Sequence, residues 1–108
     1  MISKGTIKIS NDIITNIAGL SALEIEGVKK VVGFNPETLM DSKIAPENKG
    51  IKMEIIDGYV NIDMSLIVEN GAKIPEVASL VQNSIIDQIT IMTGLNVGNV
   101  NLNICGIE

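Results

Sequence analysis

The sequence contains no histidine, no arginine and no tryptophan, and it has one cysteine among 108 residues. Without histidine, a Ser-His-Asp triad, a Cys-His pair and any histidine metal site are excluded. Cys105 cannot form an internal disulfide, and it has no obvious cationic neighbour that would activate it. No segment resembles a calcium loop or a phosphate-binding glycine loop. We therefore expect a structural thiol, no metal site, no cofactor and no catalytic residues.

Aromatic side chains are also scarce, because Phe34 and Tyr59 are the only two. Proteins that bind single-stranded nucleic acids usually stack bases on several aromatics. The charge balance has the same implication, since eight lysines stand against thirteen acidic residues, for a net charge of −5. A phosphate backbone would be repelled on average. Direct binding to nucleic acid is not expected.

The length and hydrophobic content fit one domain, which we place at residues 1–108. Hydrophobic residues make up 45% of the chain and are mostly aliphatic. No apolar run approaches the roughly 20 residues that span a bilayer, and the N-terminal segment is short and polar for a signal peptide. The expected location is the cytoplasm, and work at a membrane would require another protein to bring the chain there.

In the first third of the chain, the pattern predicts a strand, a helix and a second strand. Apolar and polar residues alternate over 5–10, which is typical of a strand. Ser10 fits a helix N-cap, and a helix of about 15 residues should follow and stop at Gly27. Residues 28–34 indicate a short strand. The polar segment 35–50 is predicted to be a loop, with one helical turn that begins at Pro36.

The clearest local signal is Asp57-Gly58 between two alternating segments, which predicts a two-residue β-hairpin. This turn fixes the pairing of the two strands. Met53 and Ile62 should share the face that packs on the core. Lys52 and Asp63 should be neighbours on the opposite, polar face, in a contact worth about 0.2–1 kcal/mol.

A second helix is predicted between Pro75 and Gly94, followed by a strand in which Val100, Leu102 and Ile104 alternate with asparagines. Together these elements predict an α+β fold, with two helices packed on one face of a small mixed sheet, in the order strand-helix-strand-strand-strand-helix-strand. The residues expected on the apolar face of the second helix are Val77, Leu80, Val81, Ile85, Ile89 and Met92.

The polar face of this sheet should include Asn101 and Asn103, and a solvated surface is the simplest interpretation. The strand that begins at Tyr59 is longer than its hairpin partner, so its distal part must pair with another strand of this chain or with another chain. Exposed apolar residues on a polar face are candidate contacts for a protein partner or a second copy. On this face they are Ile56, Tyr59 and Ile67.

The segments "GTIKIS", "IITNIAGLSALEIEGVKKVVG" and "IPEVASLVQNSIIDQITIMTGLNVGNVNLNICGI" resemble the alkaline shock protein family of Gram-positive bacteria, also called the envelope stress response or general stress family. The resemblance runs from Gly5 to Ile107. It implies a non-enzymatic cytoplasmic protein that self-associates and is linked to the inner side of the cell envelope through a separate membrane-anchored partner. The matched residues are mostly expected in the core, caps and turns.

Three functional hypotheses remain open. The first is a scaffold or adaptor of the envelope stress response, which acts by protein–protein contact and self-association. The second is a nucleic-acid or regulatory ligand-binding module, which a salt-sensitive shift with RNA would support. The third is an enzyme that uses only carboxylates or an oxygen-ligated metal, which a divalent ion in an acidic pocket would support.

Overall fold

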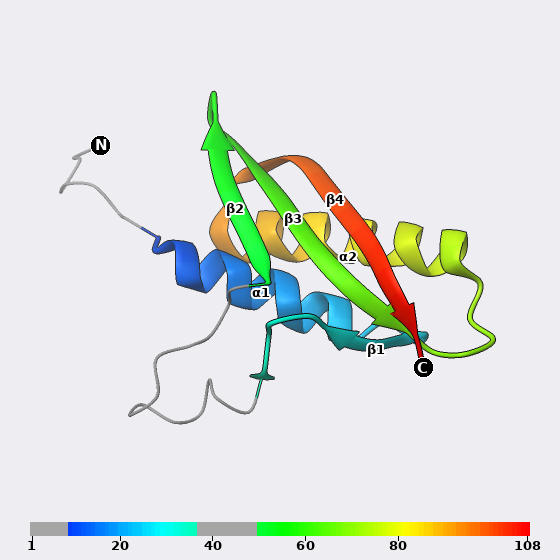
Figure 1. Ribbon diagram of the computed structural model, residues 1–108. Coiled ribbons are helices and arrows are strands. Elements are labelled where there is room, and N and C mark those ends of the chain that lie inside the picture. Colours follow the sequence, from blue (N-terminus) through cyan, green and yellow to red (C-terminus); the bar gives the residue numbers. More distant parts are fainter. Residues whose placement is uncertain (1–8, 37–49) are drawn as a thin grey trace, which may run out of the picture.

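A computed structural model of the chain describes residues 9–36 and 50–108. The described part contains two helices and four strands, in the order α1 (Asn11–Leu23), β1 (Val28–Val31), β2 (Ile51–Ile56), β3 (Tyr59–Val68), α2 (Ile74–Thr93) and β4 (Asn96–Ile107). Both helices pack on the same face of the sheet (Figure 1). The α+β fold and the order of these elements are as the sequence predicts. The strand expected over 5–10 and the helical turn expected after Pro36 fall largely outside the described residues.

Helix α1 begins where the sequence predicts, because the Ser10 side chain accepts a hydrogen bond from the backbone N–H of Ile13 at 3.4 Å. The helix ends earlier than expected. Its last residue is Leu23, so it has 13 residues, and Gly27 comes after the helix with a φ of 102°. The difference arises because the backbone N–H of Ile25 bonds to the carbonyl of Ala22, which ends the α-helical ladder.

Helix α2 is bounded by the residues that the sequence indicates. Pro75 lies in its first turn, and Gly94 ends it in a left-handed conformation with a φ of 76°. The expected apolar face is only partly buried. Leu80 and Met92 were predicted to pack on the core, but they are 54% and 64% exposed. The two helices form a single layer, and nothing in the described residues covers the sides on which these two residues lie.

The hairpin β2–β3 has the predicted register at every pair. Lys52 pairs with Asp63 and Met53 pairs with Ile62. Asp57 and Gly58 both have positive φ, at 52° and 82°, as a tight hairpin turn requires. Ile62 is fully buried and Lys52 is exposed, so the two faces differ in polarity as expected.

Strand β3 is the centre of the sheet, and its distal part does not lack a partner. Along one edge it pairs antiparallel with β2 and then with β1, where Val31 faces Leu66. Along the other edge it pairs with β4, which runs parallel to it. The extension of β3 beyond β2 is therefore covered by strands of the same chain, which is the first of the two alternatives that the sequence left open.

The core lies between the sheet and the helices and is almost entirely aliphatic. Its fully buried side chains include four from β3, which are Val60, Ile62, Leu66 and Val68, and three from α2, which are Val81, Ile85 and Ile89. Small residues on α1 permit close packing, and a Cβ at Gly19 would lie only 2.7 Å from the ring of Phe34.

Candidate interaction surfaces

The polar face of the sheet contains the asparagines of β4, and part of their hydrogen-bonding capacity is used within the sheet. Asn61 on β3 accepts a hydrogen bond from the backbone N–H of Asn99 at 3.0 Å, and its side-chain amide donates to the carbonyl of Tyr59 at 3.2 Å. Asn103 donates to the Ser65 hydroxyl at 3.5 Å. A shallow hollow of about 230 Å³ lies beside Asn101 and Asn103. Asn61 therefore has a structural role, since it ties β3 to β4.

The described residues contain no arrangement typical of a catalytic or metal site. Over residues 9–36 and 50–108, no three Cys, Asp or Glu side chains come together as metal ligands. The Cys105 thiol is exposed and lies 3.6 Å from the carbonyl oxygen of Leu66. The ion pair between Lys30 and Glu108 has an N–O distance of 4.0 Å with both side chains largely exposed, and such pairs contribute little to stability.

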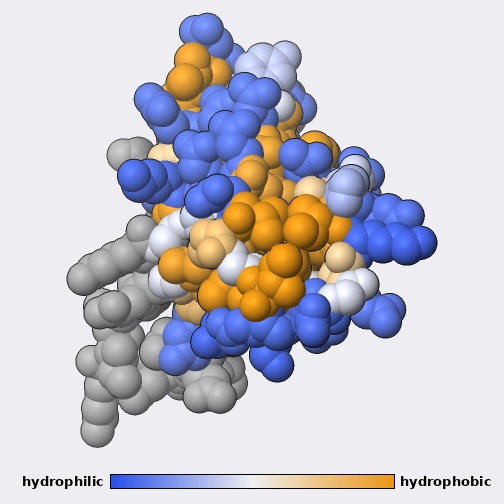
Figure 2. Space-filling model, turned by 45° about the vertical axis from the view of Figure 1, so that its right-hand side comes forward, coloured by the Kyte–Doolittle hydropathy of each residue, from blue (hydrophilic) through white to orange (hydrophobic). Residues whose placement is uncertain are grey.

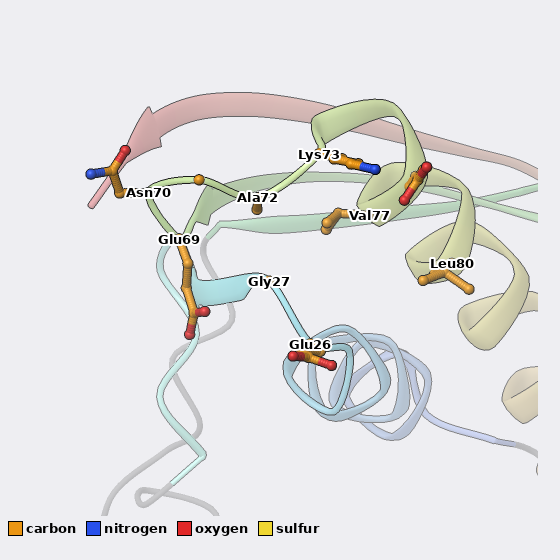
Figure 3. A pocket seen from close by; sticks show the side chains of 10 residues that line it. Glu26, Gly27, Glu69, Asn70, Ala72, Lys73, Val77 and Leu80 are labelled. Atoms are coloured by element: carbon orange, nitrogen blue, oxygen red, sulfur yellow. The ribbon is translucent and has the colours of Figure 1, made fainter.

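A pocket of about 390 Å³ lies where the end of α1, the loop after β3 and the start of α2 meet (Figure 3). Ala72 and Val77 line its apolar part, and Glu26 and Glu69 come from different segments at its rim. Figure 3 shows that these two carboxylates extend from separate segments and do not converge on a common point. The described residues form no metal-ligand cluster here, and the lining of the pocket combines charged and aliphatic side chains.

The tip of the β2–β3 hairpin is apolar on both faces. Ile55, Ile56 and Tyr59 are each about half exposed. Figure 1 shows that this turn projects beyond the helices, so the helix layer does not reach it. Ile56 and Tyr59, two of the predicted contact residues, face each other across the hairpin. The structure thus brings them together at an accessible position.

Ile67, the third predicted contact residue, lies elsewhere. It is on the same strand as Tyr59 but eight positions later, a distance of about 26 Å along a strand. It is half-buried, pairs with Lys30 on β1 and Gly106 on β4, and lines a separate hollow of about 690 Å³ with Phe34. Ile67 therefore cannot form one continuous contact patch with the hairpin tip.

Sequence analysis missed a further set of exposed apolar residues on the helices. Besides Leu80 and Met92, Ile91 is 76% exposed, and Ile13 and Leu20 on α1 are also exposed. Leu80 and Met92 have the spacing of core residues, so the pattern alone assigns these two to the core. Ile91 is not among the residues expected on the apolar face of this helix. Only the absence of a second layer over the described helices reveals them as surface.

The outer edge of β4 is a further candidate. Figure 1 shows β4 at the border of the sheet beside α2, and Figure 2 turns this side of the molecule forward. Apolar side chains gather in the middle of that view, with hydrophilic side chains around them. Beneath this edge, the Gln82 side chain on α2 donates a hydrogen bond to the carbonyl oxygen of Val100 at 3.0 Å.

The fold and the surfaces define the class of this protein, which is a small α+β domain with exposed apolar residues. Its described part contains no catalytic constellation. MamM-CTD, of which a variant structure has been solved, shares the fold, with a TM-score of 0.56 at 10% identity over 92% of this chain and 100% of that chain. At this identity the similarity concerns the fold alone. No helix in the described parts of the chain combines the length and hydrophobicity of a membrane span.

The chain belongs to the alkaline shock protein 23 family, because the model of this family matches residues 2–108. The family is described as having a cell envelope-related function. It is 34% identical to the Bacillus subtilis protein YqhY over 106 residues, which is 96% of this chain and 78% of YqhY. It is 31% identical to YloU of the same organism, over 96% of this chain and 89% of YloU. The family membership that the sequence motifs indicate is confirmed.

Proposed function

We propose that this protein is a non-enzymatic scaffold or adaptor of the cell-envelope stress response, which acts by contact with other proteins and by self-association. The observation that carries the proposal is the projecting hairpin tip, where Ile56 and Tyr59 are exposed together. An isolated exposed apolar residue is normal, but paired residues on a projecting turn form a compact contact. The cell envelope-related description of the family supports the setting.

The hairpin tip is tested by placing charges on it. The variant Ile56→Lys/Tyr59→Asp should lower the average mass of the wild-type assembly toward that of the monomer, because charged side chains are costly to bury in an apolar contact. The measurement is light scattering behind a sizing column over a range of concentrations. Circular dichroism should show an intact fold, since both side chains are half exposed.

Thr90→Lys is the matched control, because it adds a charge at an exposed position on α2. It should leave the mass distribution unchanged. Ile67→Lys tests the third contact residue independently, since Ile67 lies far from the tip. If the wild type remains monomeric at high micromolar concentration, self-association is refuted. If it assembles but the hairpin variant assembles equally well, the tip is not the contact.

Recruitment to the inner face of the cell membrane is the second part of the proposal. We place the protein in the cytoplasm and assign its attachment to a separate membrane-anchored protein. Purified chain should sediment with inverted membrane vesicles of Bacillus subtilis, which encodes relatives of this chain. It should not sediment with protein-free vesicles of the same lipids or with protease-treated membranes. Equal binding to protein-free vesicles would show that lipid, not a protein, is the attachment.

A further inference from the structure

The outer edge of β4 lacks the features by which proteins usually prevent edge-to-edge pairing. Such edges are normally protected by charged residues, by proline or by a covering segment. None of the 12 residues of β4 is charged and none is proline. β4 pairs with β3 along one side, and within residues 9–36 and 50–108 no strand pairs with its other side. Within the part of the chain that the structure describes, this edge of the backbone is therefore open to an additional strand.

The sequence of β4 reads nearly the same in both directions around Leu102. Asn101 corresponds to Asn103, and Val100 corresponds to Ile104. Two copies of β4 can pair antiparallel about a two-fold axis at Leu102. Each residue before Leu102 in one copy then faces the residue that lies equally far after Leu102 in the other copy. Such an interface must be self-complementary. Further out, Gly98 corresponds to Gly106 and Val97 to Ile107, and the symmetry is broken only where Asn99 corresponds to Cys105.

The geometry of β4 has the same centre as its sequence. Its register against β3 is regular over Val100–Ile104, a stretch of five residues with Leu102 in the middle. The register shifts before Val100 and again after Ile104. Bulges bend a strand and interrupt its pairing. The regular part of the edge therefore begins at Val100 and ends at Ile104, with Leu102 at its centre.

The charge distribution favours a second copy as the partner. Two copies with a net charge of −5 each repel one another on average. Contact through β4 avoids part of this repulsion, because neither strand contributes a charged side chain. Beneath the edge lies the neutral Gln82 of α2. The carbonyl of Val100 accepts from Gln82, and its second lone pair remains available to a partner strand.

We propose that two copies of this chain associate by antiparallel pairing of β4 with β4 about a two-fold axis at Leu102, which joins the two sheets into one. Asn101 of each copy then faces Asn103 of the other on the polar face. This inference rests on the proposed self-association and assigns one surface to it. The apolar side chains of β4 continue the core-side layer across the axis.

Charged pairs test both the surface and the register. Asn101→Lys/Asn103→Lys places lysine opposite lysine in both symmetric contacts, whereas Asn101→Lys/Asn103→Asp places lysine opposite aspartate in both. Asn101 and Asn103 are exposed, so neither variant disturbs the core. Sedimentation velocity should show a dissociation constant at least about 10-fold higher for the first variant than for the second. The second should dimerise at least as tightly as the wild type, and high salt should reduce the difference.

The outcomes separate this inference from the proposed function. If the wild type self-associates and both variants do so equally well, another surface is used, and only the β4 inference is overturned. If both variants weaken the dimer to the same extent, the pairing is not centred on Leu102, and the inference is again overturned. A wild type that stays monomeric at high micromolar concentration overturns the proposed self-association as well.

Discussion

Gly27→Ala should be among the most destabilising single substitutions outside the main core. Gly27 has a φ of 102°, and a Cβ there would lie 2.7 Å from a Val77 methyl group on α2 (Figure 3). The left-handed backbone costs a non-glycine residue about 1–2 kcal/mol, and overpacking typically costs about 1–3 kcal/mol. Gly27→Ala should therefore lower the free energy of unfolding by about 2–5 kcal/mol, out of about 5–15 kcal/mol for a typical domain.

Gly71→Ala provides the matched control for backbone strain. Gly71 also has a positive φ, of 90°, but a Cβ there would meet no atom within 4 Å. Its cost should be limited to about 1–2 kcal/mol. The contribution of Val77 is isolated in the background of Val77→Ala, which removes the methyl groups that the new Cβ would meet. In that background Gly27→Ala should cost no more than Gly71→Ala does in the wild type.

The assay is urea unfolding followed by far-ultraviolet circular dichroism, with the midpoint and slope fitted for each variant. With a slope of about 1–3 kcal/mol/M, a loss of about 2–5 kcal/mol should lower the midpoint of Gly27→Ala by about 0.7–5 M. The reasoning is refuted if Gly27→Ala is no more destabilising than Gly71→Ala. It is also refuted if Val77→Ala leaves the cost of Gly27→Ala unchanged, because the contact between the loop and α2 would then have no energetic effect.

Three further substitutions test the helix cap, the central strand and the edge thiol. Ser10→Ala should lower the free energy of unfolding by about 0.5–1 kcal/mol, because the helix loses its cap, and Ser10→Asp should retain it in the same urea assay. Leu66→Ala should cost about 2–5 kcal/mol, since Leu66 is fully buried in β3, whereas Ile56→Ala at the exposed tip should cost far less. Cys105→Ser should change stability by no more than about 0.5 kcal/mol and leave self-association intact. Labelling of Cys105 by mild electrophiles at rates far above those of a free thiol would contradict its structural role.

The parts of the fold that were predictable are those fixed by local chemistry. Asp57-Gly58 permits the positive φ values of the turn, and the turn then determines every cross-strand pair of the hairpin. Pro75 and Gly94 limit α2 for equally local reasons. The exposure of Ile56 and Tyr59 followed from the same register, so the hairpin tip was identifiable as a candidate surface from the sequence.

The parts that were not predictable depend on which elements become neighbours. Alternation over β4 indicates a strand but cannot show that it pairs parallel to β3 and forms an edge of the sheet. The burial of Leu80 could not be decided either, because helical spacing is the same whether or not another layer covers the helix. The near-symmetry of β4 is visible in the sequence, but it acquires meaning only when the strand is known to lie at an edge.

The central position of β3 has a consequence for the synthesis of the protein. The chain leaves the ribosome N-terminus first. Val31, the last residue of β1, therefore emerges 35 residues before Leu66, its partner on β3 (66 minus 31). At about 5–20 residues per second, β1 waits about 2–7 s before β3, its partner among the described strands, has been made. α1 likewise cannot pack on α2 until most of the chain has been made. The N-terminal third therefore depends on the later two thirds for its structure, and a nascent chain that stops before β3 exposes the apolar face of α1 to chaperones and proteases.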